Sequence, residues 1–372
     1  MPTFEPISWD SERIACFAAV RAWECGSGTL WRIWNKHKGS VDEFLRDPGA
    51  WKRLQCTDVQ QAALRASSVR LDQAIEELDR ENIRFTLPWD PEFPSSLTHI
   101  PDPPAAIFIR GEVTTDALRV AIVGTRKATS YGRRSASELA RDIGEAGVDI
   151  VSGLAFGIDE AAHLGALACG ARTIGVIPCG VSDRSVVPHS HLKLAHRIIE
   201  HRGALISEHA PDTPTLPYQY LHRNRLIAGL SQATIIVEAD IQSGALTTAK
   251  LALEQGADVL AVPGSIYSPV SRGTHALIRD GAKPCTCAAD VLELRSFGSA
   301  ERIASMNATR SSLPMSAAEH ATLDALTEPM DINAIVRKTG RHASDVNSTL
   351  TTLELKGYVV RQGQEYVRVN NK

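Results

Sequence analysis

The stretch AIVGTRKATSYG, residues 121–132, holds the first unit of a repeating strand and helix pattern. It starts as an apolar run, the run ends at Gly124, and a first helical turn is expected near Ser130 or Tyr131. This order predicts a buried strand, a tight turn and a helix. Backbone N–H groups at such a turn bind anions, and Arg126 adds a bidentate phosphate donor. The stretch lacks the GxGxxG pattern, which argues against a bound dinucleotide.

The same change from a short apolar run to a helix-length segment recurs through the middle of the chain. The intervals between runs are 28, 25, 31, 29 and 26 residues, and the runs begin near Val120, Val148, Thr173, Ala204, Ala233 and Val259. Each interval has the size of one strand plus its crossover helix. The pattern therefore predicts an α/β fold with a doubly wound, mainly parallel sheet that has helices on both faces. Ligands on such sheets bind at the carboxyl ends of the strands.

The first quarter of the chain has a different composition. It contains all six tryptophans, and apolar residues recur at helical spacing in Leu71, Ile75 and Leu78. Between residues 87 and 105 there are six prolines, which fix φ and remove backbone donors, so an extended connector is expected rather than a helix. We predict a helical domain over residues 1–84, followed by the sheet domain with its proline-rich lead-in over residues 85–295.

The last part of the chain predicts a linker and a small domain. Residues 296–315 are rich in Ser and Ala and have no sustained period, as a linker would. Residues 316–372 contain three helix-like segments and two strand-like segments, the outline of a winged helix. This domain has seven acidic and seven basic residues, without the cationic surplus of an independent DNA-binding domain. A protein-interaction or structural role is favoured for it.

Composition limits the function classes. The chain has 372 residues, and its 40 Lys and Arg against 43 Asp and Glu leave a net charge of -3, so nucleic acid could bind only at a local basic patch. The seven cysteines contain no CxxC pair, which favours a reducing cytoplasm over a disulfide framework or a zinc module. The N-terminus has no signal-peptide pattern and no apolar run approaches membrane-spanning length, so a soluble cytoplasmic protein without a membrane partner is expected.

The motif SGLAFGIDEAAHLGAL, residues 152–167, marks the end of the second parallel strand. Ser152 and Gly153 close that strand, and Asp159 follows where a helix begins. Helix capping is the commoner role of such an acid. His163 lies one helical turn later, so a hydrogen bond to Asp159 is expected, and no nucleophile stands at a recognisable spacing from the pair.

Two further motifs place polar residues at predicted strand ends. Arg223, Asn224 and Arg225 form a compact cluster directly before an apolar helix segment, where arginines serve phosphate or pair with acids. Ser243 and Gly244 begin another helix. The nearby acids Glu238 and Asp240 have no matched histidine or cysteine, so capping or arginine pairing is favoured over metal or acid–base chemistry.

The sequence predicts no metal site, no cofactor and no catalytic residue. The HSH segment at residues 189–191 has no second ligand cluster, and the cysteine pair at residues 285 and 287 has the wrong spacing for zinc. Basic residues instead recur beside predicted strand ends, at Arg126, Lys127, Arg184, Lys193, Arg223 and Arg225. Several phosphate-sized sites in a row suit a polyanion better than a mononucleotide.

Together these motifs resemble the DprA/Smf family, the DNA-processing proteins of bacterial natural transformation. The resemblance extends from about residue 91 to residue 290 through AIVGTR, SGLAFGIDEAAHLGAL, RNRLIAGLS, SGALTTA and GTHALIRDGA, in order. It implies an extended Rossmann-like domain that binds single-stranded DNA, forms homodimers, helps load the RecA recombinase and is not an enzyme. It also implies a sterile-alpha-motif-like N-terminal domain and a C-terminal winged helix.

The resemblance assigns a nucleic-acid-binding site. Its residues are Gly124, Thr125, Arg126, Ser152, Gly153, Lys193, Arg223, Asn224, Arg225, Ser243 and Gly244. Two departures stand out: this chain has Val186-Val187-Pro188 and Leu221-His222 where many members have an aromatic residue before a proline or a Phe-Pro pair. Base stacking at those positions would then depend on Tyr218 or Tyr220.

Two other functions remain open from the sequence. One is a nucleotide-processing enzyme similar to the phosphoribohydrolases that share this type of sheet. Those enzymes carry a PGGxGTxxE motif, and the nearest stretch here, PGSIYSPVSRGTHALI at residues 263–278, lacks the second glycine and the glutamate. The other is a scaffold whose winged helix is the main functional surface.

Overall fold

The computed structural model describes residues 9–21, 42, 71–115, 117–211, 213, 215–297, 317–326, 330–355, 359–362 and 365–368. The chain divides into two compact units, Met1–Asn307 and Ala308–Lys372. Nearly all of the predicted linker lies outside the described residues, as do four of the six tryptophans. The proposed domain limits at residues 84, 295 and 316 stay predictions.

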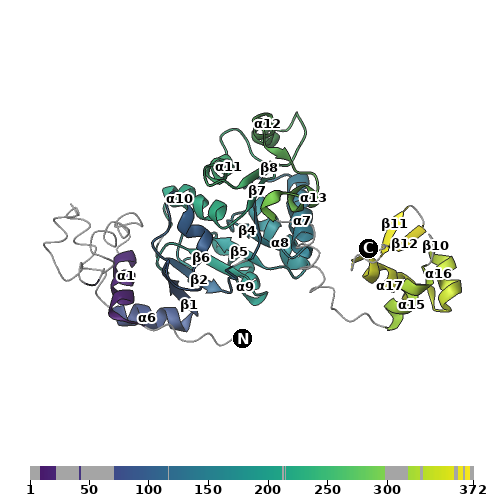
Figure 1. Cartoon of the computed structure of the whole chain (residues 1–372), viewed down its shortest axis with the longest axis horizontal. Helices are drawn as coiled ribbons and strands as arrows, with labels where there is room; N and C mark the ends of the chain where they lie inside the picture. The colour runs from purple at the N-terminus through teal and green to yellow at the C-terminus, as the bar shows by residue number, and fades with distance from the viewer. Residues whose placement is uncertain are drawn as a thin grey trace. The chain divides into compact units, whose positions relative to one another are not determined.

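The first unit is built on a sheet of nine strands (Figure 1). The strands are β1 (Ile83–Thr86), β2 (Ile107–Gly111), β3 (Arg119–Val123), β4 (Asp149–Ser152), β5 (Thr173–Val176), β6 (Ala204–Ser207), β7 (Ala233–Ile236), β8 (Asp258–Ala261) and β9 (Lys283–Pro284). Strands β3 to β8 begin within one residue of the six predicted positions, which confirms the parallel sheet. The spatial order is β1-β2-β6-β5-β4-β3-β7-β8-β9.

The strand order reverses at β3. Strands β4, β5 and β6 follow one another on one side of β3, whereas β7, β8 and β9 lie on its other side. The crossover helices that leave β3 and β7 therefore diverge at the carboxyl ends of these neighbouring strands, where an open crevice forms. This topological switch point positions the functional site.

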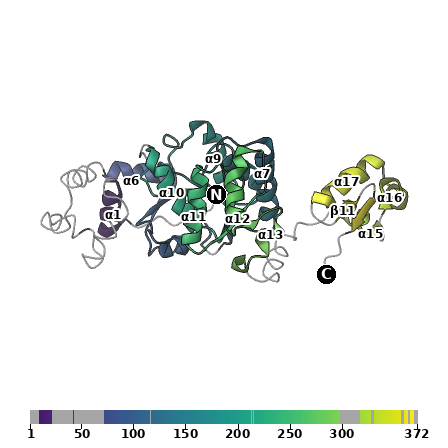
Figure 2. The same ribbon diagram turned by 90° about the horizontal axis from the view of Figure 1, so that it is seen from above.

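Helices cover both faces of the sheet. They are α1 (Ser11–Arg21), α6 (Leu71–Arg80), α7 (Ser130–Glu145), α8 (Ile158–Ala168), α9 (Leu192–Glu200), α10 (Pro217–Gly229), α11 (Gly244–Glu254), α12 (Arg272–Arg279) and α13 (Ala289–Leu292). Short 3₁₀ helices add η2 (Ser95–His99), η3 (His189–His191), η4 (Pro269–Ser271) and η5 (Arg295–Phe297). In Figure 2 α10 and α11 lie next to each other, and both pack on the same face of the sheet.

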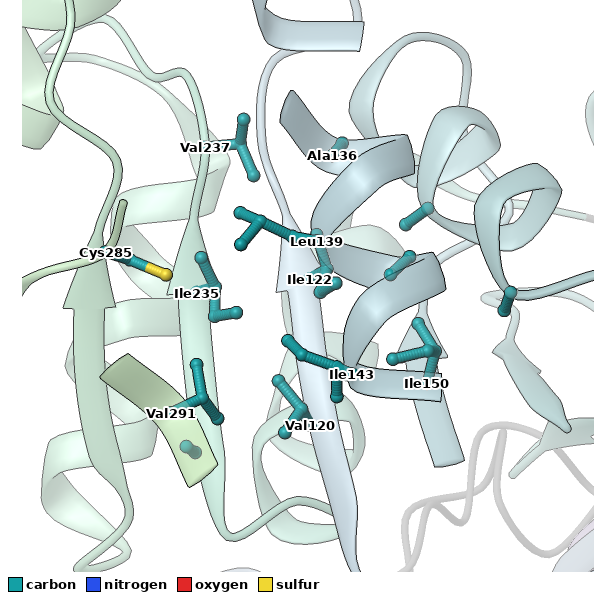
Figure 3. Packing of buried hydrophobic residues seen from close by; sticks show 14 of the residues in the cluster. Val120, Ile122, Ala136, Leu139, Ile143, Ile150, Ile235, Val237, Cys285 and Val291 are labelled. Atoms are coloured by element: carbon teal, nitrogen blue, oxygen red, sulfur yellow. The ribbon is translucent and has the colours of Figure 1, made fainter. Parts of the chain in front are cut away.

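The core follows the two-residue period of the strands. On β3, Val120 and Ile122 face α7 and α8, whereas Ala121 and Val123 face α10 and α11. Figure 3 shows the first of these layers, with Leu139 of α7 directed at the strands. A strand that is buried on both faces must be apolar at consecutive positions, which is why the sequence locates these strands so well.

The proline-rich segment contains more structure than predicted. It joins β1 to β2, which pair antiparallel at the edge of the sheet, and it includes the 3₁₀ helix η2. The prediction of a wholly extended connector is wrong for residues 95–99 because the span 95–100 contains no proline, so its N–H groups are available. Arg84, the expected domain boundary, lies within β1.

The described N-terminal helices share a core with this edge of the sheet. The Phe17 ring of α1 lies 5.3 Å from the ring of Phe85 in β1 and 6.1 Å from that of Phe108 in β2, measured between centroids. Arg13 pairs with Asp90 at 2.7 Å. Helix α1 therefore packs directly on the edge strands.

The second unit confirms the winged-helix prediction. It contains the three helices α15 (Ala317–Ala325), α16 (Ile332–Thr339) and α17 (Ala343–Leu355), and the two strands β11 (Val359–Gln362) and β12 (Glu365–Arg368). A further short strand, β10 (Met330–Asp331), pairs with β12. Its own core is formed by residues such as Leu326, Ile335 and Leu350.

Candidate nucleic-acid interface

A cavity of about 300 Å³ opens at the switch point, between the loops that follow β3 and β4 and the helices α10 and α11. It is lined by Val123, Gly124, Thr125, Arg126, Ala155, Asp159, Tyr220, Leu221, Arg223, Asn224, Ile227, Ser243, Gly244, Ala245 and Thr248. Two regions differ in exposure. We define the floor as Asp159 and Arg223, and the rim as Arg126, Tyr220, Ser243 and Gly244.

The rim presents a solvent-exposed cation on an aromatic ring. The Arg126 side chain is exposed, and its guanidinium carbon lies 4.6 Å from the centroid of the half-buried Tyr220 ring. This contact orients the guanidinium without using its hydrogen-bond donors. Of the two tyrosines that could replace the missing aromatic residues, Tyr220 lines the cavity, whereas Tyr218 lies outside the set of lining residues.

The floor holds a buried arginine. Arg223 is only 6% exposed, and its Nη1 donates to the carbonyl oxygens of Gly153, at 2.8 Å, and of Val176. Burial lowers the pKa of Arg223 to about 10, and the charge of Asp159 opposes that shift. Burial likewise raises the pKa of Asp159, against the opposing charge of Arg223. Each charged group thus compensates the burial of the other.

Gly153 allows these two charges to approach. A Cβ at this position would lie 2.5 Å from Asp159 Oδ2 and 2.7 Å from Arg223 Nη1. Any larger residue would therefore displace one or both side chains. Neighbouring Ser152 is buried and donates to the carbonyl of Ile122 at 2.6 Å, so both residues support the floor from behind and neither lines the cavity.

Asp159 and His163 do not form the predicted hydrogen bond. Asp159 Oδ2 accepts from the backbone N–H of Ala155 at 3.3 Å, and Gly157 is the N-cap of α8. His163 Nδ1 instead lies 2.7 Å from Thr173 Oγ1. The two residues lie one turn apart, as expected, but their side chains contact different elements. Asp159 lies near Arg223 at Gly153, whereas His163 contacts Thr173 of β5. A sequence motif on one helix does not show which neighbouring element each side chain contacts.

The start of α7 is closed by the protein's own carboxylate. The backbone N–H of Thr129 donates to Glu238 Oε2 at 2.9 Å, and the Thr129 hydroxyl donates to the other oxygen of Glu238. Thr129 is the N-cap residue, accepting from Gly132 N. The helix begins where the sequence predicts, but its positive end already holds an anion. The anion-binding role expected of this turn therefore depends on the Arg126 side chain.

The start of α11 reaches the cavity directly. Ser243 is its N-cap residue and accepts from the backbone N–H of Ala245 at 3.3 Å, and Gly244 is exposed. The Asn224 side chain donates to the carbonyl oxygen of Gly244 at 3.4 Å. The partial positive charge at this helix end faces the rim, where it favours an anion.

Arg225 lies outside the cavity. Its Nη2 donates to both Glu208 oxygens, at 2.7 and 2.8 Å, and its Nε donates to Asp102 at 2.9 Å. Hydrogen bonds from His222 and then Arg225 lower the pKa of Asp102. The prediction of one Arg-Asn-Arg cluster at a helix start is wrong, because α10 begins at Pro217 and residues two apart on a helix face different directions.

The structure brings together seven of the eleven predicted site residues as cavity lining: Gly124, Thr125, Arg126, Arg223, Asn224, Ser243 and Gly244. Lys193 is exposed in the first turn of α9, outside the lining set. Leu221 and Ile227 were not predicted as site residues. They lie one helical turn from Asn224 and Arg223, so α10 periodicity could have indicated them. Within the described residues, no group of three or more His, Cys, Asp or Glu side chains is arranged to hold a metal ion.

The fold and site define a class: a doubly wound α/β protein with a ligand cavity at its switch point and basic groups at the mouth. The family described as DNA recombination-mediator protein A matches residues 84–296, and the DprA winged helix domain matches residues 306–364. The chain belongs to this family, DprA/Smf, as its strand-end motifs indicate.

Individual relatives agree with this assignment. The chain is 36% identical to Protein Smf of Escherichia coli over 292 residues, which cover 76% of this chain and 77% of that protein. It is similar to the structure of DNA processing protein A from Streptococcus pneumoniae, with a TM-score of 0.62, 29% identity and coverage of 77% and 98% of the two chains. The Helicobacter pylori DNA processing protein A gives a TM-score of 0.50, 30% identity and coverage of 56% and 94%. Among the described residues, no helix is both long and apolar enough to cross a membrane.

Proposed function

We propose that this chain binds single-stranded DNA at the switch-point cavity, without catalysing a reaction on it. The observation that carries the proposal is the rim, where the exposed Arg126 guanidinium rests on Tyr220 at the mouth of the cavity and opposite the start of α11. A phosphate needs a cation with free donors and a helix end of positive potential, and an unpaired base needs an aromatic face. The solved Helicobacter pylori relative is described as binding single-stranded DNA.

The global charge is compatible with this role. The net charge of -3 excludes a cationic coat, but a groove needs only a few cations along one strand. At the floor, the buried Arg223 donates to the carbonyl oxygen of Gly153 and lies near the opposite charge of Asp159, so it holds the loop after β4. Arg126 supplies the exposed charge. Binding through phosphates and stacking gives little sequence preference.

Further proposals follow from family membership. We propose that the protein acts as a homodimer that protects incoming DNA and helps load the RecA recombinase during transformation or recombination, in the cytoplasm. A phosphoribohydrolase-like activity is less well supported. Its natural candidate for a catalytic acid, Glu238, is 2% exposed and is held by the backbone and hydroxyl of Thr129. A carboxylate that caps a helix is not positioned to exchange protons with a substrate.

The test is Arg126→Ala, measured by fluorescence anisotropy with labelled oligo-dT across a salt series. We expect binding to weaken about tenfold, or about 1.4 kcal/mol, and the slope of log affinity against log salt to fall by about one. The matched control is Arg141→Ala, an exposed arginine near the other end of α7. Unchanged affinity and slope in Arg126→Ala, or equal losses in both variants, would overturn the proposal.

A further inference from the structure

Phe156 is an exposed aromatic ring beside the cavity that the proposed site does not use. Its side chain is 47% exposed and lies in the loop between β4 and α8. The residue before it, Ala155, lines the cavity. The residue after it, Gly157, has a positive φ of 84° and lies so close to the β3–α7 loop that a Cβ there would be 2.7 Å from the carbonyl oxygen of Arg126. The backbone of this loop is therefore packed against the β3–α7 loop at the cavity border.

A buried histidine supports the ring. Phe156 and His191 make an edge-to-face contact, with centroids 4.6 Å apart and planes at 67°. His191 is 4% exposed, and its Nδ1 lies 3.0 Å from the carbonyl oxygen of Leu154. Leu154 itself has a left-handed φ of 59°, which directs that carbonyl at the histidine and is a costly conformation for a leucine. The other ring nitrogen, Nε2, lies 3.5 Å from Glu160 Oε1, so the histidine ring meets an oxygen at each of its nitrogens.

Two exposed cations belong to the segments that contact the β4–α8 loop. Arg126 lines the cavity and belongs to the β3–α7 loop, on which Gly157 packs, and Lys193 is exposed in the first turn of α9, two residues after His191. We name Phe156, His191 and Lys193 the shelf. An exposed aromatic ring on a loop that packs against two cation-bearing segments has the composition of a stacking site for a base whose flanking phosphates meet those cations. An apolar protein partner would not need the cations.

We propose that the shelf is a second nucleotide subsite, where Phe156 stacks on a base of the single strand just outside the cavity and Lys193 contacts its phosphate. The inference rests on the proposed function and adds the path of the bound strand. The strand leaves the cavity over the β4–α8 loop towards α9. It also gives a role to Lys193, which does not line the cavity itself.

The experiment compares Phe156→Ala and Phe156→Tyr in the full-length chain with two probes, oligo-dT and an oligomer of the same length made of abasic sites. Loss of a stacked base costs about 1 to 3 kcal/mol, so Phe156→Ala should bind oligo-dT about tenfold more weakly. Its affinity for the abasic oligomer and its salt slope should stay unchanged. Phe156→Tyr keeps the ring and should bind oligo-dT as the unmodified chain does.

The control is Trp89→Ala, which removes an aromatic side chain of the same exposure, 47%, beyond β1 and five strands from β3. It should leave both affinities unchanged. Equal oligo-dT affinity in Phe156→Ala and the unmodified chain, or an equal loss on the abasic oligomer, would overturn the shelf. If Arg126→Ala weakens binding and Phe156→Ala does not, the shelf alone fails. If the unmodified chain does not bind oligo-dT, the proposed function fails first.

Discussion

The floor and the rim of the cavity each contain an arginine, and the two residues have opposite environments. Arg223 is buried, donates to two carbonyl oxygens and lies near the opposite charge of Asp159. Arg126 is exposed, and its guanidinium rests on a tyrosine ring. The same side chain therefore stabilises the fold in one region and is available to a ligand in the other. Burial, and not residue type, decides whether removing an arginine changes the unfolding free energy or the affinity for DNA.

The largest expected effect is on the floor. Arg223→Ala removes hydrogen bonds to two carbonyl oxygens and the nearby charge that opposes the burial of the Asp159 carboxylate, so we expect a loss of about 3 kcal/mol. Urea unfolding followed by circular dichroism measures this loss. Arg126→Ala, the matched change at the rim, should alter the unfolding free energy by less than about 0.5 kcal/mol.

A double variant separates the effect of the lost charge from the effect of the lost hydrogen bonds. If the cost arises from the unpaired carboxylate, Arg223→Ala combined with Asp159→Asn should recover part of the stability. No recovery would show that the lost hydrogen bonds to Gly153 and Val176, and not the charge, dominate. Equal stability of the Arg223→Ala and Arg126→Ala variants would contradict the distinction between floor and rim.

Two glycines provide a second test of the difference in packing between floor and rim. At Gly153 a Cβ would overlap Asp159 and Arg223, whereas at Gly244 the nearest atom, in Leu221, would lie 3.8 Å away. Gly153→Ala should therefore destabilise the fold by about 1 to 3 kcal/mol through overpacking. Gly244→Ala should stay within about 0.5 kcal/mol of the unmodified chain in the same urea experiment. A destabilisation of similar size in both would refute the assigned difference in packing.

The smallest effect concerns pH. His163, on α8 beneath the floor, is fully buried, and burial lowers its pKa to about 3, with further lowering by the charges of His191 and Arg223. The unfolded chain takes up this proton below about pH 6.5 and the folded chain does not, so stability falls as the pH drops from 6.5 towards 3. At pH 5 the loss is up to about 2 kcal/mol.

The measurement is the unfolding free energy at pH 7.5 and at pH 5 for the unmodified chain and for His163→Asn. The asparagine keeps a donor for Thr173 Oγ1 but cannot be protonated. The loss of stability between the two pH values should be smaller in the variant. An identical loss in both chains would assign the acid sensitivity to other groups.

Much of the fold could be predicted because its signals are local. The six parallel strands appear as continuous apolar runs, and the starts of α7 and α11 appear as small polar residues after a strand. The edge strands β1, β2 and β9 were not predicted. Strands β1 and β2 border the proline-rich segment, and β9 has only two residues, one of them a proline. Their pairing depends on distant partners such as β6.

The candidate site was predictable only in part. Sequence order indicated that Gly124, Arg126 and Ser243 would meet, because all follow strands whose carboxyl ends lie at one edge of the sheet. It did not separate Arg223 from Arg225, nor did it show that Glu238 closes the start of α7. Those outcomes depend on which acids other elements bring near: Asp159 from α8, Glu208 from the end of β6 and Asp102 from the proline-rich segment.

The sequence by itself determined the parallel sheet, the winged helix, the family and the edge of the sheet that carries the site, because apolar periodicity and strand-end motifs are properties of contiguous residues. Only the tertiary structure decided which charges are buried in pairs and which remain exposed. Electrostatic compensation is set by distances between residues far apart in the chain, as the contrast between Arg223 and Arg126 shows. It also decided that Phe156 meets His191, 35 positions away in the sequence.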